Sequence, residues 1–334
     1  MCLDDEDETA AAITPDENQH PMDDMDSTYA GEADRVSLTS LTSSLLKGQV
    51  EGGRTYAIYG KEEYGLPMDE AELERIDMCH VKYCALIGKK KYLAPIGQPQ
   101  RILDLGCGTG IWSIEMAEEF PGALVTGVDV APTQPDWVPP NCHFEIDDIE
   151  QLWTWPDSFD FIYSRDLLLA IRDWPKLIDQ TYKHLKPGGW VEFQAIIGVL
   201  GCDDDSIPED SYLRKFSSTM EAGSTQFGAS LSDPMRWKGW FDDRGFCNVT
   251  QRVFKLPFNP WAADPRLKIL GAWEMENLLG GLEAMVSRMF QKGLGWTRDE
   301  VTVFLGHLKR EVTDPGMHGY WPYCVVYAQR PPEG

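Results

Sequence analysis

The sequence predicts an α/β fold in which helices cover a largely parallel β-sheet. From residue 100 onward, short apolar stretches alternate with helical stretches, a pattern typical of parallel sheets. Glycines closely follow the first predicted strand, at Gly106, Gly108 and Gly110. The chain has 334 residues and is 43% hydrophobic, so it is long and apolar enough to bury a sizeable core.

The amino-terminal region differs in composition from the rest. Residues 1–45 hold twelve acidic residues and one basic residue, a net charge of −11 within a total of −24. They show no hydrophobic periodicity, so we expect a disordered acidic tail. The acidic balance argues against binding to nucleic acid or to an anionic membrane surface, because both need clustered basic residues.

The sequence also indicates where the protein resides. Its first residues lack the basic and apolar parts of a secretory signal, and no apolar run reaches the ~18 residues that span a bilayer. We therefore expect a cytoplasmic protein, with a nuclear location as the alternative. The eight cysteines include no CxxC pair, so we predict neither a metal site nor a redox dithiol.

Residues 46–97 are predicted to form a helical lid. A helix is expected over residues 68–93, with acidic residues in its first turn and apolar residues along its length. Pro95 and Gly97 end it. The lid precedes the first strand of the sheet, so it can fold over that strand's glycine loop.

Residues 98–331 are predicted to form the main domain. Strands are expected at 101–104, 124–129, 142–146, 159–164, 190–194, 248–255 and 323–329. Helices are expected at 111–120, 173–185, 211–226 and 233–243, with Asp173 as a cap and residues 186–189 as a turn. A helical insertion at about 258–309 separates the last two strands, and its length predicts a cap with its own role.

The glycine loop carries the first chemical information. Asp104 ends the first strand, and GxGxG spacing follows, with a helix expected to start near Thr109. Glycines permit a tight turn and close approach of a ligand to the backbone. A dinucleotide-binding dehydrogenase would use GxGxxG to hold a pyrophosphate, which the acid would repel. A cationic amino acid moiety suits Asp104 better.

Two further aspartates follow the next strands. Asp129 ends the second, where a carboxylate can accept both hydroxyls of a ribose. Asp148 follows the third, where it can accept an adenine amino group. Each aspartate alone is equally compatible with a turn or capping residue. Together with Asp104 they lie at successive strand ends on one sheet edge, which predicts a nucleoside ligand with a cationic part.

These motifs resemble those of class I S-adenosylmethionine-dependent methyltransferases. The resemblance rests on residues 104–110, Asp129, Asp148-Ile149 and 185–189. Further stretches resemble the fungal LaeA-like methyltransferases and extend the similarity over roughly residues 36–331; they are 53–56, 93–96, 137–141, 171–175, 189–194, 255–257 and 293–296.

The resemblance implies a Rossmann-like class I methyltransferase sheet of seven strands, the last antiparallel, with a helical cap from the amino-terminal helix and the insertion. It implies S-adenosyl-L-methionine as cofactor. The cofactor-binding residues that it implies are Asp104, Gly106, Cys107, Gly108, Asp129, Val130, Asp148, Ile149 and Ser164.

Methyl transfer is an in-line displacement at an already activated carbon, so the protein mainly aligns the reactants and excludes water. A general base is needed only for a hydroxyl or a protonated amine. His80 in the lid helix and His318 before the last strand are the candidate bases. The alternative for both is a hydrogen-bonded core or surface histidine.

The cap supplies candidate acceptor-binding residues. Tyr83, Trp261 and Trp273 are predicted to line the acceptor cavity beside Ser164 and Gln194. Large aromatic side chains can wall a dry cavity at low entropic cost. The alternative is that they only form the cap's own core.

Two functions follow from the resemblance. The first is a biosynthetic enzyme that methylates a small molecule in fungal secondary metabolism. The second is a LaeA-like nuclear regulator that acts through protein partners. The basic triplet at 89–91 lies inside an apparent helix and is no convincing nuclear import signal. We therefore favour the enzyme.

Overall fold

A computed structural model of the chain describes residues 12–15, 48–58, 65–156 and 158–333. The predicted disorder of residues 1–45 falls outside these ranges except at 12–15. There, the backbone N–H of Ala263 donates to the carbonyl of Thr14 at 2.7 Å, and Pro15 forms an isolated bridge with Ala262. Thr14 and Pro15 therefore contact the first residues of the predicted cap insertion.

The central sheet confirms the predicted fold class. Within the described residues it has eight strands in the order β5-β4-β3-β6-β7-β10-β8, and β9 pairs with β10 outside that path. Strands β3 to β7 run parallel, whereas β10 is antiparallel to both β7 and β9. The strands are β3 (Arg101–Leu105), β4 (Leu124–Asp129), β5 (Cys142–Ile146), β6 (Phe159–Arg165), β7 (Leu185–Ile196), β8 (Gly201–Cys202), β9 (Cys247–Pro257) and β10 (Gly319–Gln329). A separate hairpin joins β1 (Gln49–Glu51) to β2 (Arg54–Tyr56).

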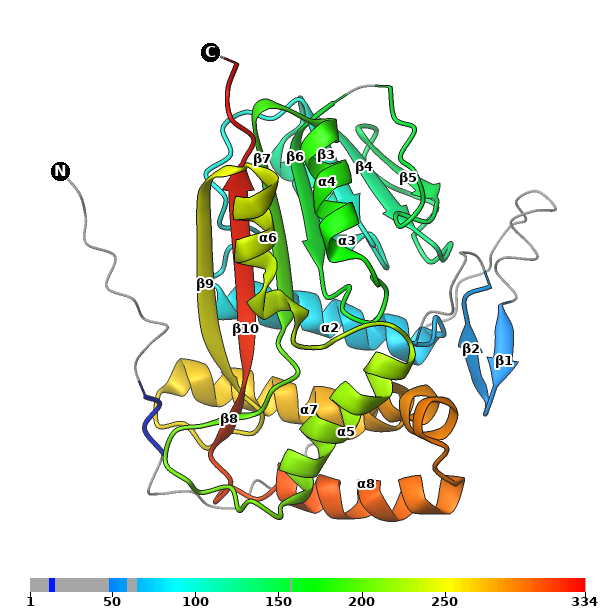
Figure 1. Cartoon of the computed structure of the whole chain (residues 1–334), viewed down its shortest axis with the longest axis vertical. Coiled ribbons are helices and arrows are strands. Elements are labelled where there is room, and N and C mark those ends of the chain that lie inside the picture. The colour runs from blue at the N-terminus through cyan, green and yellow to red at the C-terminus, as the bar shows by residue number, and fades with distance from the viewer. Residues whose placement is uncertain (1–11, 16–47, 59–64, 157, 334) are drawn as a thin grey trace.

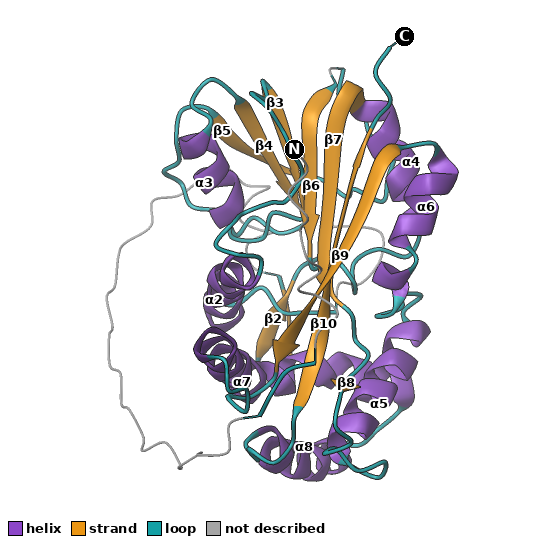
Figure 2. Cartoon of the chain, turned by 90° about the vertical axis from the view of Figure 1, so that its left-hand side faces the viewer, coloured by secondary structure: helices purple, strands orange, loops and turns teal. Residues whose placement is uncertain are grey.

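Helices cover both faces of the sheet (Figure 2). One face carries α2 (Glu70–Leu86), α3 (Ile111–Glu119) and α7 (Pro265–Ser287). The other carries α4 (Trp174–His184), α5 (Tyr212–Gln226) and α6 (Trp237–Arg244), the last preceded by a 3-10 turn (Asp233–Met235). Helix α7 continues into a π-helix (Arg288–Gly293), and α8 (Arg298–Val312) follows before β10.

Local signals explain most helix boundaries. Asp69 caps α2 by accepting from the Glu72 N–H, and Asp173 caps α4 by accepting from the Lys176 N–H at 2.9 Å, as predicted for Asp173. Helix α2 ends at Leu86, earlier than the sequence predicted, because Gly88 and Lys89 adopt φ values of +83° and +60°, which a helix does not allow.

The predicted turn at residues 186–189 differs from the structure. Strand β7 begins at Leu185, and its register against β6 shifts between Phe159 and Phe161. The four residues form a bulge, held by Gly188 N–H donating to the Arg330 carbonyl at 2.9 Å. The bulge arises because the end of β10 supplies partners that the local sequence does not reveal.

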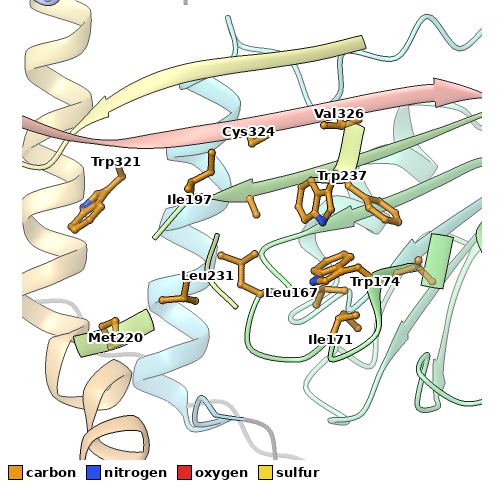
Figure 3. Packing of buried hydrophobic residues seen from close by; sticks show 14 of the residues in the cluster. Leu167, Ile171, Trp174, Ile197, Met220, Leu231, Trp237, Trp321, Cys324 and Val326 are labelled. Carbon is orange, nitrogen blue, oxygen red and sulfur yellow. The ribbon is translucent and has the colours of Figure 1, made fainter. Parts of the chain in front are cut away.

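The largest buried cluster lies between the sheet and the layer of α4, α5 and α6. In it, the rings of Trp174 and Trp237 pack at an angle of 57°, with their centroids 4.8 Å apart (Figure 3). Trp237 therefore belongs to the core on the face opposite α2. None of the described helices is both long enough and apolar enough to cross a bilayer.

Candidate active site

A cavity of about 200 Å³ lies at the carboxyl ends of β3, β4 and β6. Helix α2 runs across the sheet beside these strand ends (Figure 1). Eight residues predicted to bind the cofactor line it: Asp104, Gly106, Cys107, Gly108, Asp129, Val130, Asp148 and Ile149. They come from three strand ends and the loops that follow. The parallel strands bring them together because all their carboxyl ends lie on one sheet edge.

The glycine loop needs its glycines for steric reasons. Gly106 and Gly110 have φ values of +67° and +80°, in the left-handed region. A Cβ on Gly110 would lie 2.3 Å from the Phe144 ring, and one on Gly106 would lie 2.3 Å from the Leu167 side chain. The Gly106 N–H donates to the Val128 carbonyl at 2.8 Å. The loop is thus fixed in a tight turn against β4.

Asp129 holds this loop from the end of β4. Its carboxylate accepts from the Gly108 N–H at 2.8 Å and from the Ala131 N–H at 2.9 Å. Burial raises the pKa of Asp129 to about 6, although the backbone donors act in the opposite direction. Each carboxylate oxygen keeps a second lone pair, so the group can still accept from a ligand in the cavity.

Asp104 is the second buried carboxyl group of the cavity. It accepts from the Ser113 hydroxyl on α3 at 2.6 Å. Burial raises its pKa to about 7, although the hydrogen bond from Ser113 and the positive charge of Arg165 act in the opposite direction. The cavity therefore contains a carboxyl group that a cationic ligand would stabilise in its ionised form.

Asp148 and Ile149 line the cavity from the loop after β5. Asp148 also accepts from the Glu150 N–H at 3.0 Å and from the Gln151 side-chain amide at 3.1 Å. The Asp148 side chain thus has two roles: it stabilises a local turn, and it also lines the cavity. The two interpretations that the sequence left open are compatible.

An arginine at the end of β6 adds a positive charge to this wall. Nη2 of Arg165 donates to Nδ1 of His80 at 2.8 Å, and its guanidinium carbon lies 5.9 Å from the Tyr83 ring centroid. Nε2 of His80 lies 3.1 Å from a Glu115 carboxylate oxygen. Burial, followed by the charges of Arg165 and Lys91, lowers the pKa of His80 to about 3, so its ring is neutral at pH 7.

Helix α2 is held both to the glycine loop and to α7. The Thr109 hydroxyl donates to the Asp77 carboxylate at 2.6 Å. Arg75 forms a bidentate pair with Glu72, at 2.9 and 2.6 Å, and donates to the side chain of Asn277 on α7 at 2.8 Å. Both Arg75 and Glu72 line the cavity, so these contacts fix its outer wall.

Comparison with known proteins identifies the fold family. The profile of a methyltransferase domain matches residues 80–251, more than half of the chain. The methyltransferase pytC of Aspergillus terreus is 36% identical over 297 residues, which cover 88% of this chain and 92% of that protein. A secondary metabolism regulator of Cochliobolus heterostrophus is 33% identical over 290 residues, 84% of this chain and 94% of its own. The chain belongs to the LaeA-like class I methyltransferases.

S-adenosylmethionine is the cofactor of this methyltransferase. A solved Haemonchus contortus phosphoethanolamine N-methyltransferase aligns with a TM-score of 0.45 and 18% identity, over 77% of this chain and 57% of that protein. Similarity at this level says nothing about the methyl acceptor. The cavity suits a ligand that carries a positive and a negative charge, because its lining includes the carboxyl group of Asp104 and the guanidinium of Arg165. The Arg165 Nη1 atom is buried without a hydrogen-bond partner among the described residues.

Two predicted residues of the methyltransferase lie just outside the cavity lining. Ser164 is buried on the opposite face of β6, because side chains alternate along a strand and Arg165 takes the cavity side. Gln194 lies one strand farther, opposite Arg165 in the register. It accepts from the Tyr323 hydroxyl at 2.7 Å, and Tyr323 stacks on Tyr83.

The structure places Trp261 and His318 away from the cavity, which corrects two predictions. Trp261 donates to the Gly319 carbonyl at 2.8 Å and packs on the His318 ring. His318 pairs with Asp204 at 2.6 Å. His318 precedes Tyr323 by five residues of extended chain, which separates the two residues by ~16 Å at the rise of a strand. The sequence did not reveal that β10 extends so far beyond the sheet edge.

The other acceptor-side predictions have mixed outcomes. Tyr83 lines the cavity as predicted. Trp273 is half-buried on α7 and packs against the cluster that contains Tyr83, without lining the cavity itself. His80 is not a free base, because Arg165 and Glu115 occupy both ring nitrogens.

Sequence reasoning missed Tyr163, Arg165 and Asp166, which all line the cavity. A signal for them existed: they sit at the carboxyl end of the strand next to β3, the position where parallel sheets bind ligands. Asp166 also has a φ of +54°, an unusual value for a residue other than glycine. The sequence alone gave no reason to prefer them to Ser164.

Proposed function

We propose that this methyltransferase transfers the methyl group of S-adenosylmethionine to a small organic acceptor in secondary metabolism. The observation that carries the proposal is the composition of the cavity. Its sheet side presents charged groups, and the facing segment and α2 present apolar side chains such as Leu66, Met68 and Leu73 beside the ion pair of Arg75 and Glu72. A mostly apolar pocket with a few convergent polar groups is typical of small-molecule sites.

The cofactor-facing residues take the following proposed roles. Asp129 accepts the ribose hydroxyls, and Asp148 and Ile149 contact the adenine. Gly106 and Gly108 allow the methionine half to approach the backbone. The bound cofactor supplies an activated methyl group, and the chain's own residues orient it and exclude water.

The acceptor side of the cavity is formed by the lid and the insertion. We propose that residues 46–97 act as a lid, and that the insertion at about 258–309 acts as a cap. The contacts of α2 with α7, through Arg75 and Asn277, support this division. Tyr83 is the aromatic residue proposed to contact the acceptor, because it lines the cavity next to Arg165.

A second candidate function is regulation through a protein acceptor. The 33% identity with a secondary metabolism regulator over 94% of its length favours it. In that case the acceptor would have to enter the same cavity as an extended side chain. The apolar wall of Leu66, Met68 and Leu73 suits a small apolar molecule equally well, so the nature of the acceptor needs a direct test.

The purified full-length protein, incubated with methyl-tritiated S-adenosylmethionine and a cell extract of its host, tests the two functions. The extract is separated beforehand into a low-molecular-weight fraction and a protein fraction, and Asp129→Ala serves as the inactive control. We expect label in the low-molecular-weight fraction that depends on Asp129. Label confined to the protein fraction would overturn the proposal in favour of the second function.

A further inference from the structure

Helices α2 and α7 lie side by side as the outer layer on one face of the sheet (Figure 2). They run antiparallel to each other. Lys82 of α2 pairs with Glu274 of α7, and Arg266 near the start of α7 donates to the Leu86 carbonyl at the end of α2, at 2.6 Å. These contacts fix which outward-facing residues of the two helices are neighbours.

Apolar side chains occupy the middle of this outer surface. Val81 on α2 and Ile269 on α7 are 51% and 54% exposed, and Met78, Ala85 and Trp273 are partly exposed. The antiparallel register sets Val81 beside Trp273, and Ala85 beside Ile269, so the five residues form one continuous patch. An exposed apolar patch rimmed by charged residues is typical of an interaction site.

Charged residues flank the apolar patch, and their signs are segregated. Exposed acidic residues lie toward the start of α2 and the end of α7, at Glu70, Glu74, Glu276 and Glu283. Basic residues lie toward the opposite end of the layer, at Lys89, Lys90, Arg266 and Lys268, together with Asp264, which caps α7. The layer therefore has an acidic end and a basic end, although the whole chain carries a net charge of −24.

The layer is also large enough for a specific interface. At 1.5 Å per residue, the 17 residues of α2 and the 23 residues of α7 span ~25 Å and ~35 Å, and two packed helices are ~20 Å wide. The outer surface therefore covers roughly 600 Å² in projection, which is comparable with the ~800 Å² per partner of a typical stable complex.

We propose that this α2–α7 surface joins two copies of the chain in a symmetric dimer. The twofold axis lies between the copies near Val81 and Trp273, perpendicular to the helix axes. Rotation about such an axis reverses the direction of the helices, so the acidic end of one copy faces the basic end of the other. An axis parallel to the helices would set the two acidic ends against each other, which costs free energy. The charges thus select the arrangement in which the Val81 side chains of the two copies face each other.

Sedimentation equilibrium of the full-length protein tests the dimer. We expect twice the 37.7 kDa mass of one chain. Val81→Asp should raise the dissociation constant on the order of 10- to 100-fold, because it buries a charge at the apolar centre of the interface. Val303→Asp makes the same change at an exposed position of α8 and should leave the dimer intact. A monomeric wild-type protein, or equal effects of the two variants, would overturn the proposal.

Charge reversal tests the direction of the axis. Glu74 and Lys90 lie on opposite sides of Val81 in the sequence, so Glu74 of one copy faces the basic end that contains Lys90 of the other. Glu74→Lys should weaken the dimer, and Lys90→Glu in the same chain should restore it. Asp243→Lys on α6, across the sheet, is the control and should have no effect. All three replaced side chains are exposed, so the variants should fold, which circular dichroism verifies. A dimer that Glu74→Lys leaves unchanged, or that Lys90→Glu does not restore, would refute this arrangement.

Discussion

Nδ1 of His80 accepts a hydrogen bond from Nη2 of Arg165 at 2.8 Å, which joins the lid helix to the end of β6 at the cavity wall. The neighbouring Glu115 carboxylate oxygen lies 3.1 Å from the other ring nitrogen. A protonated Nδ1 would have to face a guanidinium, so the contact requires a neutral ring with its proton on Nε2.

His80 should therefore remain neutral in the folded protein down to about pH 4. Its pKa is lowered to about 3, below the value of ~6.5 in an unfolded chain. The folded state binds fewer protons, so this residue's contribution to stability is complete above pH ~6.5 and is lost as pH falls toward 3. Nitrogen NMR measures the protonation state of the His80 ring as pH is varied, and the His80 signal is assigned by its loss in the His80→Gln variant. Protonation of His80 near pH 6 would contradict the prediction.

Asp104 should show the opposite pH dependence. Its pKa is raised to about 7 by burial, so the folded state binds more protons than the unfolded chain between pH ~4 and 7. The wild-type protein without cofactor should therefore lose stability relative to Asp104→Asn as pH rises through this window, by up to about 4 kcal/mol. Urea unfolding of both proteins at several pH values measures the difference, and a constant difference would refute the prediction.

Asp129 should contribute directly to cofactor affinity. Asp129→Ala is expected to weaken binding of S-adenosylhomocysteine by roughly 2–4 kcal/mol, because two hydrogen bonds from ribose hydroxyls to a charged acceptor are lost. Asp129→Asn should lose less, because its amide oxygen can still accept from Gly108 N–H. The exposed Asp136→Ala is the control. An unchanged calorimetric affinity in a folded Asp129→Ala protein would reduce Asp129 to a turn residue.

The buried ion pair of Lys82 and Glu274 should stabilise the contact between α2 and α7. Both side chains are buried, so Glu274→Gln leaves a buried cation without its counterion and should cost about 3–5 kcal/mol. Replacing both residues with methionine should restore much of the loss. Lys238→Met breaks an exposed pair with Asp242 and should cost less than about 1 kcal/mol. Equal costs for the two single variants in urea unfolding would exclude the proposed role of burial.

Gly110→Ala should lower the free energy of unfolding, because the backbone conformation and the space at this position both require glycine. The positive φ costs about 1–2 kcal/mol, and the new Cβ would meet the Phe144 ring at 2.3 Å. We expect a loss of roughly 2–4 kcal/mol. Gly122→Ala, which has open space around its Cβ, is the control. Adding Phe144→Leu should recover the steric part of the loss; a neutral Gly110→Ala in thermal unfolding would disprove the strain.

The sequence by itself determined the features that depend on local signals. Strand and helix alternation follows from hydrophobic periodicity, and the glycine loop and Asp129 follow from their positions at strand ends. The carboxyl ends of parallel strands necessarily meet at one edge. Eight residues that the motifs and the family resemblance predicted as cofactor-binding line the cavity.

Only the tertiary structure decided which residues complete the wall of the cavity. Arg165 and Ser164 are neighbours in the sequence, yet the pleat of β6 sends one to the cavity and the other to the opposite core. Likewise, His318 and Tyr323 are close in sequence, but extended β10 carries His318 to Asp204 while Tyr323 stacks on Tyr83. Strand register and side-chain alternation depend on pairing between distant segments, and no local pattern encodes them.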